Sequence, residues 1–163
     1  MAERRGYRGY IASRPVRGMT TAQRVQNLVV RDYCARRGFA YLISSTEYAM
    51  PGCFMMLENV LAELPKLEGI VCFSAFMLPP QPARRRAIYA RVLDSGATLH
   101  AALENLTLRS VAEIAPLEDL LSAALLLERV PLSGRYEKTD RPLAASEDPF
   151  VRALIPAFMS ATL

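Results

Sequence analysis

Lysine and histidine are scarce in this 163-residue sequence, and its cysteines form no metal-binding pattern. Lys66 and Lys138 are the only lysines beside 18 arginines, and His100 is the only histidine. Catalysis by an imidazole would therefore have to use His100. The three cysteines are widely spaced without a CxxC pair, so neither a zinc site nor a disulfide framework is indicated. We expect a reducing compartment, no metal and no cofactor.

Long apolar runs are also absent from the sequence. None approaches the ~18 residues that a bilayer-spanning helix needs, and the first residues lack the apolar segment of a secretion signal. Hydrophobic residues make up 52% of the chain, which is enough for one domain with a sizeable core. We therefore expect a cytoplasmic protein without a membrane partner.

The net charge of +4 is unevenly distributed along the chain. Residues 1–38 contain nine arginines against Glu3 and Asp32, whereas the remainder is slightly acidic. Overall basicity of this size is weak evidence for nucleic acid binding, and we expect no nucleic acid partner. The local excess instead favours a small anionic ligand near the first strand and helix.

Apolar strand-like runs alternate with helix-period segments. Strands are expected near residues 9–12, 39–43, 69–73 and 97–103, and helices near 22–38, 53–64, 83–95 and 116–130. This alternation predicts an α/β fold with a mostly parallel sheet of four or five strands and helices on both faces. We expect one three-layer, flavodoxin-like domain over residues 1–130. In such sheets ligands bind at the carboxyl ends of the strands.

The first and last of these helices carry specific expectations about burial. In the first, the expected buried stripe is Val25, Leu28, Val29 and Tyr33. The last is apolar nearly all round, which implies burial on two sides and at least a homodimer. Residues 131–163 are expected to form a C-terminal arm that packs on the domain or on a neighbouring subunit.

Polar side chains follow the predicted strands and supply the candidate site. Ser13 and Arg14 follow the first strand, where a hydroxyl and a bidentate guanidinium suit a phosphate or carboxylate; a turn with a surface arginine is the alternative. Glu47 and Tyr48 follow the second strand and suit acid–base chemistry. Helix capping would explain the serines beside them but not this pair. Glu104 follows the fourth strand and would pair with Glu47 if the two strand ends converge.

Three further features each have two interpretations. His100 is flanked by apolar residues, which favours a core or surface role over catalysis. Cys53 is expected at a helix N-terminus, where it would be a nucleophile if its pKa were lowered, or else a small buried hydrophobe. The run Arg84–Arg86 opposes the helix dipole, so it is either a solvated helix start or the contact for an acidic partner.

About residues 7–105 resemble the catalytic domain of serine recombinases, the resolvases and invertases. The resemblance rests on the order of elements and on the stretches Gly9–Ser13, Tyr33–Cys34 and Leu67–Val71. It implies a resolvase-like fold. Recombinase chemistry also uses arginines after the third strand and before the second helix, where this chain has Phe76–Gln81 and Pro51–Phe54. The resemblance therefore does not extend to DNA strand transfer.

A second resemblance, over about residues 6–130, is to a small bacterial family called sporadic carbohydrate cluster proteins. It rests on the stretches Gly6–Ile11, Ser13–Pro15, Val25–Asn27, Arg31–Cys34, Glu47–Met50 and Phe73–Ser74. This resemblance implies a soluble protein of the bacterial cytoplasm, encoded among genes for surface polysaccharide or related sugar biosynthesis.

These features lead to the hypothesis of a small enzyme that binds a sugar, sugar phosphate or nucleotide sugar and catalyses isomerisation, epimerisation or elimination. The expected catalytic residues are Glu47, Tyr48, Ser13 and Glu104. The expected ligand contacts are Tyr10, Arg14, Gln26, Asn27, Arg31, Ser45, Met50 and Ser74, with Arg14 and Arg31 on the anionic group. The alternative is a noncatalytic dimerising or regulatory partner of another enzyme in the same pathway.

Overall fold

A five-stranded sheet forms the centre of the domain in a computed structural model that describes residues 4–129. The strands are β1 (Tyr7–Ala12), β2 (Tyr41–Glu47), β3 (Gly69–Cys72), β4 (Thr98–Ala101) and β5 (Leu106–Leu108). They lie in the order β2-β1-β3-β4-β5, with β1 to β4 parallel and β5 antiparallel to β4. The mostly parallel α/β sheet predicted from the sequence is confirmed.

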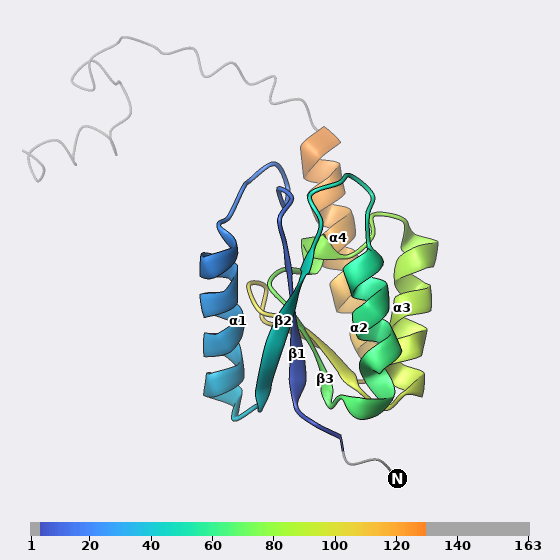
Figure 1. The fold of residues 1–163 in the computed structure, drawn as a ribbon. Helices are drawn as coiled ribbons and strands as arrows, with labels where there is room; N and C mark the ends of the chain where they lie inside the picture. Colours follow the sequence, from blue (N-terminus) through green and yellow to red (C-terminus); the bar gives the residue numbers. More distant parts are fainter. Residues whose placement is uncertain (1–3, 130–163) are drawn as a thin grey trace, which may run out of the picture. The chain divides into compact units, whose positions relative to one another are not determined.

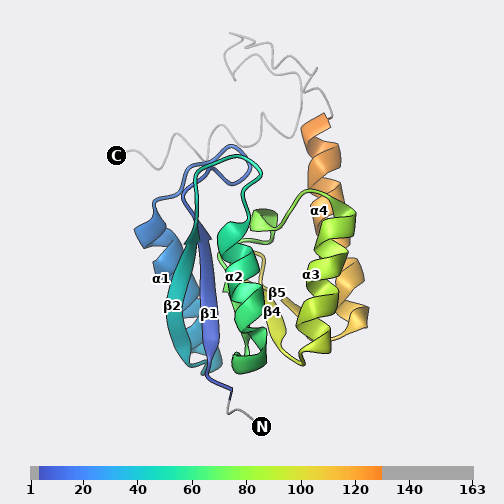
Figure 2. The same cartoon turned by 45° about the vertical axis from the view of Figure 1, so that its right-hand side comes forward.

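Helices cover both faces of this sheet. They are α1 (Gln23–Arg37), α2 (Met55–Glu63), α3 (Pro82–Asp94) and α4 (Ile114–Arg129), with short 3₁₀ segments η1 (Leu64–Lys66), η2 (Ala75–Met77) and η3 (Val111–Glu113). One face carries α1, and the opposite face carries α2, α3 and α4 (Figures 1 and 2). The result is a three-layer α/β/α arrangement, as expected for strands joined by helical crossovers.

The burial of β3 and the end of α1 follow directly from local sequence. Strand β3, with the sequence GIVC, is buried at every position, which is typical of a parallel strand covered on both faces. Gly38 ends α1 in the left-handed conformation, with φ of +67°, and its N–H reaches the last carbonyls of the helix. A side chain at this position would be strained, so glycine sets the helix end.

Strand β2 is longer than the sequence indicates. The polar residues 44–46 are expected beyond its end, but β2 continues to Glu47, and Ser45 pairs with Tyr10 of β1. The neighbouring strand supplies partners as far as Ala12, so sheet pairing overrides the polar composition. The hydroxyl of Ser45 therefore belongs to the sheet and not to a loop beyond it.

The buried face of α1 differs from the predicted stripe. The buried residues are Gln26, Val30, Tyr33 and Cys34, whereas Val25 and Leu28 are exposed. The prediction of Tyr33 is confirmed, and Val29 is partly buried against the core, whereas Val25 and Leu28 are wrong. The cause is Gln26, whose polar side chain enters the core because the backbone there satisfies its hydrogen bonds.

A buried ion pair anchors α4 to α3. Arg85 Nη2 lies 2.6 Å from Glu118 Oε2, and the Tyr89 hydroxyl donates to Glu118 Oε1 at 2.7 Å. Arg85 also donates to the carbonyls of Pro79 and Pro80. Of the two interpretations of the arginine run at 84–86, Arg85 therefore fits the one with an acidic partner, and that partner lies within the chain.

The domain covers one side of α4. Its buried residues are Leu117, Leu121 and Ala124, whereas Leu125, Leu126 and Leu127 are 44–70% exposed. Burial on two sides, as predicted from the sequence, is therefore not met within residues 4–129. The expected arm at 131–163 lies outside the described residues. In the part of the chain that the structure describes, no helix is long and apolar enough to cross a bilayer.

Candidate functional site

Glu47, the last residue of β2, is fully buried and caps the N-terminus of α2. Its Oε2 accepts hydrogen bonds from the backbone N–H groups of Met56 and Leu57, both at 3.1 Å. The Tyr10 hydroxyl donates to the same oxygen at 3.0 Å. The residue at the N-cap position, Phe54, offers no side-chain acceptor. Because the first N–H groups of a helix have no partner within it, this distant carboxylate replaces a local cap.

The hydrogen bonds to Glu47 hold it in the charged form. Burial by itself would raise the pKa of this carboxyl, but the backbone donors at Leu57, Met56 and Tyr48 outweigh burial and lower the pKa. Burial, together with the Glu47 charge, raises the pKa of the Tyr10 phenol. At neutral pH Glu47 is therefore an anion occupied by donors, and Tyr10 is a neutral donor to it.

Glu104 has the same role beside the end of β3. The buried Ser74 hydroxyl donates to Glu104 Oε1 at 2.6 Å. The N–H of Ala75 donates to Glu104 Oε2 at 2.9 Å. Ser74 Oγ in turn accepts from the N–H of Phe76 at 3.2 Å. Together Ser74 and Glu104 satisfy the first N–H groups of η2.

Glu47 and Glu104 do not form the acid–base pair considered from the sequence. Strands β1 and β3 lie between β2 and β4, so the ends of β2 and β4 are about 14 Å apart. Each carboxylate is bound to its own backbone donors. The structure brings both to the carboxyl edge of the sheet, but into separate networks.

Arg14 lies between these two networks, directly after β1. Its guanidinium donates to the carbonyl of Cys53 at 2.6 Å and to that of Met77 at 3.4 Å. It also stacks on Phe54, with its Cζ 4.5 Å from the ring centroid. Arg14 therefore ties the loop after β2 to the loop after β3, and this contact fixes the guanidinium at the carboxyl edge.

Ser13 and Gln26 differ in burial at the end of β1. Gln26 is fully buried, accepting from the N–H of Ala12 and donating to the carbonyls of Ala12 and Thr21. These bonds use its amide to fasten α1 to β1. Ser13 is exposed, and its hydroxyl accepts a hydrogen bond from Gln23 at 2.8 Å. A ligand at this edge would meet Ser13 and not Gln26.

Asn27 and Arg31 are not beside Glu47. Asn27 Oδ1 accepts from the Tyr41 hydroxyl at 3.3 Å, and Arg31 lies over the Tyr41 ring at 5.9 Å. Both residues belong to α1, whereas Glu47 binds the start of α2 on the other face of the sheet (Figure 1). The expected grouping of Arg31 and Asn27 with Glu47 is therefore wrong, because the sheet lies between them.

Four other candidate or ambiguous residues surround the segment between β2 and α2. Ser45 is half-buried within β2, while Tyr48 and Met50 are more than half exposed. Cys53 is half-buried, with its Sγ 3.5 Å from Glu47 Oε1. This thiol is a donor to the buried Glu47 carboxylate. The geometry thus favours a packing role for Cys53.

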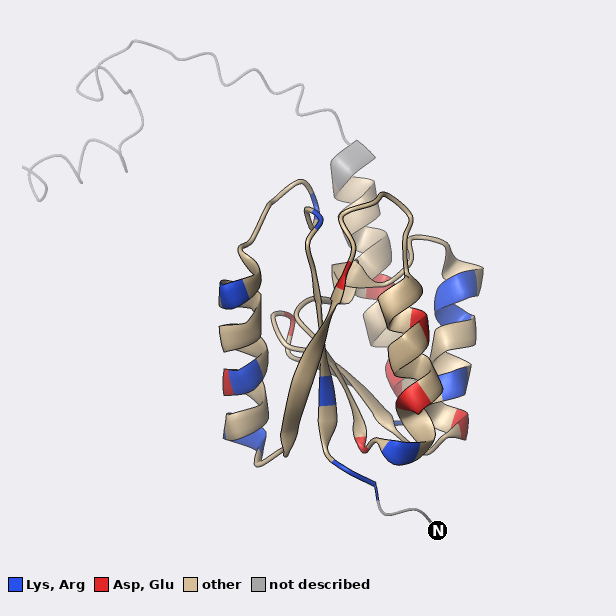
Figure 3. Cartoon of the chain, in the orientation of Figure 1, with Lys and Arg blue, Asp and Glu red and all other residues tan. Residues whose placement is uncertain are grey.

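Arginines gather at the carboxyl edge from two elements. Figure 3 shows basic positions on the loop after β1 and at the start of α3. Arg17 lies over the Phe76 ring at 4.6 Å, and Arg84 lies over the Phe54 ring at 4.8 Å. The sequence analysis did not predict Arg84 at this edge. The proline-rich connection before it was the available signal, because that connection leads from the end of β3 to Arg84. The edge therefore presents guanidinium groups from the loop after β1 and from the start of α3.

His100 lies on the α1 face of the sheet and not at this edge. It is buried, with Nδ1 3.1 Å from the Tyr33 hydroxyl and Nε2 2.9 Å from the Thr98 hydroxyl. The core interpretation of this histidine fits its burial. Among residues 4–129, no group of three or more His, Cys, Asp or Glu side chains could hold a metal ion.

Solved structures similar to this chain are recombinase domains. The crystal structure of a resolvase family site-specific recombinase from Streptococcus pneumoniae has a TM-score of 0.53 and 10% identity, covering 96% of this chain and 99% of that chain. The chain has a resolvase-like fold. The N-terminal catalytic domain of TP901-1 integrase has a TM-score of 0.48 and 15% identity, covering 75% of this chain and 96% of that chain. No protein-family model and no curated protein sequence matches the chain.

Proposed function

We propose that the protein binds a sugar phosphate, or a similarly anionic sugar-like metabolite, at the carboxyl edge of its sheet through Ser13 and Arg14. One observation carries this proposal: the carboxylates of the edge, Glu47 and Glu104, are occupied by backbone N–H groups. The groups left to meet a ligand are therefore a hydroxyl and a guanidinium. Both can donate hydrogen bonds to phosphate oxygens.

Arg14 is suited to this role because its position is fixed before a ligand arrives. Two carbonyls, those of Cys53 and Met77, accept from its guanidinium, which has five N–H donors in all. The two loops that Arg14 joins are also those in which serine recombinases, by the resemblance described above, carry phosphate-binding arginines. One guanidinium in this chain thus reaches both places, which favours a compact phosphate group as the ligand.

The sugar part of the proposal rests on the sequence resemblance to sporadic carbohydrate cluster proteins, which implies a role in bacterial sugar metabolism. The proposal is limited to binding. Proton transfer by Glu47 receives no support, because its backbone donors lower the pKa of the carboxyl and occupy its oxygens. DNA strand transfer also receives no support, although the fold is resolvase-like, because Phe76–Gln81 contains no arginine.

Calorimetric titration with glucose 1-phosphate, glucose and inorganic phosphate tests the proposal. We expect saturable binding of glucose 1-phosphate, and a Kd raised by about tenfold or more in Ser13→Ala and in Arg14→Gln, a loss of ~1.4 kcal/mol. Ser122→Ala and Arg36→Gln, exposed changes on α4 and α1, are the matched controls and are expected to bind normally. Failure of all three compounds to bind, or normal binding by Ser13→Ala, would refute the proposed site.

A test of DNA chemistry separates this proposal from recombinase activity. Incubation with supercoiled plasmid, followed by denaturing electrophoresis, is expected to show no covalent protein–DNA adduct. An adduct that disappears in Ser13→Ala would show instead that the chain transfers strands despite the absence of arginine from Phe76–Gln81.

A second candidate function, that of a noncatalytic dimerising partner, is favoured by the exposed leucines of α4. Leu125, Leu126 and Leu127 occupy successive positions of α4 and leave apolar surface exposed on the sides of the helix that do not face the domain. We propose a homodimer through this surface. Light scattering at micromolar concentration is expected to give a dimer for the native chain and a monomer for Leu126→Glu. A native monomer would remove this candidate.

A further inference from the structure

A hollow of about 320 Å³ opens on the α1 face of the sheet, beside β4 and β5. Aromatic rings, two threonine hydroxyls and two guanidinium groups line it. Helix α1 packs on β1, β2 and β3, and the hollow begins next to the end of that helix. Its volume is at the lower end of the range for small-molecule sites.

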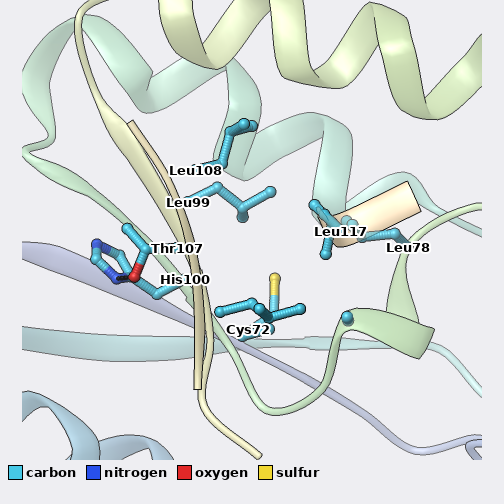
Figure 4. Close-up of a pocket in the computed structure, with 10 residues that line it drawn as sticks. Cys72, Leu78, Leu99, His100, Thr107, Leu108 and Leu117 are labelled. Carbon is cyan, nitrogen blue, oxygen red and sulfur yellow. Dashed lines mark hydrogen bonds between the residues drawn. The ribbon is translucent and has the colours of Figure 1, made fainter. Parts of the chain in front are cut away.

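The other side of the same strands has no comparable space. There Leu99, Leu108 and Leu117 surround an apolar cavity of about 10 Å³, which is the room of about one water molecule. Figure 4 shows His100 and Thr107 across the strands from these leucines. The sheet therefore separates a tightly packed side from an open, polar one.

Flat rings form one wall of the hollow. Tyr7 and Phe39 are stacked, with centroids 4.0 Å apart and planes 9° from parallel. His100 meets Phe39 edge-on at 5.1 Å. A Cβ on Gly69 would lie 2.7 Å from the Tyr7 ring, so the glycine is what allows this ring to lie across β3. The wall is rigid and apolar, because its rings support one another.

Two arginines stand at the hollow, each held by another side chain. Arg37 lies over the Tyr33 ring at 4.5 Å and donates to Asn105 Oδ1 at 2.7 Å. Arg109 Nη2 lies 3.0 Å from Glu113 Oε1. A guanidinium has five donors, so these contacts orient both groups and leave donors for an acceptor in the hollow.

The positive charges of the two arginines affect the pKa of the His100 imidazole. Burial, followed by the charges of Arg37 and Arg109, lowers the pKa of His100 to about 4, against a smaller opposing effect of Glu113. The imidazole is therefore neutral at pH 7. A titratable group perturbed by burial and by specific charges, beside an open hollow, is typical of a binding site.

We infer that this hollow binds a small aromatic anion, whose phosphate or carboxylate meets Arg37 and Arg109 while its ring packs on Phe39. The hydroxyls of Thr98 and Thr107 face the same space and can hydrogen-bond to the anion. Charge and apolar surface are both needed, because guanidinium groups and aromatic rings line the same hollow.

This site goes beyond the proposed sugar phosphate site and does not depend on it. Tyr7 is the first residue of β1, whereas Ser13 directly follows its end, about 20 Å along the strand. The two sites therefore use opposite ends of the sheet and share none of the residues named for them.

The imidazole of His100 gives a direct test, because the chain has a single histidine. Its carbon-bound proton signal can be followed by NMR at pH 7.5 during titration with phenyl phosphate, benzoate, inorganic phosphate and benzyl alcohol. We expect phenyl phosphate or benzoate to shift the signal saturably with a Kd below about 1 mM, and the ratio of the two shows which anion is preferred. Inorganic phosphate and benzyl alcohol are expected to bind at least about tenfold more weakly.

Exposed variants show whether the arginines are the contacts. Arg37→Gln and Arg109→Gln are each expected to raise the Kd by about tenfold with little change in melting temperature, while Arg36→Gln, one residue away and paired with Asp32, keeps native binding. Ser13→Ala is expected to bind normally, which distinguishes this site from the carboxyl edge. The inference is overturned if neither aromatic anion shifts the signal, if inorganic phosphate binds as tightly, or if Arg36→Gln weakens binding equally.

Discussion

The carboxyl edge and the hollow on the α1 face use their polar side chains in different ways. At the edge, Glu47 accepts from backbone N–H groups of α2, which follows its own strand, and Glu104 accepts from the N–H of Ala75 in η2, which follows the neighbouring strand β3. In the hollow, Arg37 and Arg109 bind other side chains, and they line open space together with His100. The first set completes the fold, whereas the second set is open to a ligand.

The difference follows from what the nearby backbone needs. The first N–H groups of α2 and η2 require acceptors, and a carboxylate at the end of an adjacent strand is the nearest one. The hollow borders β4 and β5, whose backbone groups already pair with each other. A polar residue at a strand end is therefore a candidate for function only after the demands of the next helix have been met.

Replacing Glu47 should have the largest effect at the carboxyl edge. Glu47→Ala leaves the N–H groups of Met56 and Leu57 and the Tyr10 hydroxyl without their acceptor. We expect a loss of about 3 to 5 kcal/mol in the free energy of unfolding, because a buried charged network is broken. Urea denaturation followed by circular dichroism measures this loss.

Glu58→Ala is the matched control, since Glu58 pairs with Arg91 at the surface. We expect a change of less than about 1 kcal/mol there. If Glu47→Ala is as mild as Glu58→Ala, Glu47 is not the cap of α2, and the contrast between the two regions disappears.

His100, which lines the hollow, should make the free energy of unfolding depend on pH. The pKa of His100 is lowered to about 4 from its ordinary value of 6.5, so the unfolded chain binds more protons between these pH values. This contribution is complete above pH ~6.5, declines as the pH falls, and changes no further below ~4. We expect the free energy of unfolding to drop by about 2 kcal/mol between pH 7 and pH 5.

His100→Gln removes the titrating group and tests the source of this slope. The charged groups near the imidazole are Arg37, Arg109 and Glu113, and the backbone N–H of Arg109 lowers the pKa of the Glu113 carboxyl. The variant should therefore show a nearly flat profile over that range. A slope equal to that of the native chain would mean that another group causes it.

Much of the fold could be predicted because hydrophobic periodicity and strand order are properties of sequence. The residue types alone predicted that β3 is a buried strand and that Gly38 ends α1 in the left-handed conformation. The end of β2 was not, because its length depends on pairing with β1. The stripe of α1 was missed because the buried position is occupied by a glutamine whose partners are backbone atoms of β1 and the preceding loop.

The candidate site was predicted less well, for a related reason. Glu47 and Ser74 were identified at strand ends, but their roles depend on how the helical segments that follow them, α2 and η2, lie against these side chains. One signal was available: the segment before α2, Pro51–Phe54, contains no serine, threonine, aspartate or asparagine to act as a cap. A helix start without a local cap indicates that an acceptor from outside the cap position is needed, and Glu47 was the nearest acid preceding the helix.

Removing the Ser74 hydroxyl is a smaller and finer test of the same contrast. Ser74→Ala deletes the donor to Glu104 and the acceptor for the N–H of Phe76, whereas Glu104 keeps the N–H of Ala75 and access to water. We expect a loss of about 1 to 2 kcal/mol, seen as a melting temperature lower by roughly 2 to 8 °C. Ser13 is an exposed serine one strand away, and Ser13→Ala should change the free energy of unfolding by no more than about 0.5 kcal/mol.

The double variant Ser74→Ala/Glu104→Gln should be less destabilised than the sum of the single changes by about 0.5 kcal/mol or more, because both residues cap η2. Strict additivity would show that the two side chains act independently, and Glu104 would then be available at the carboxyl edge after all.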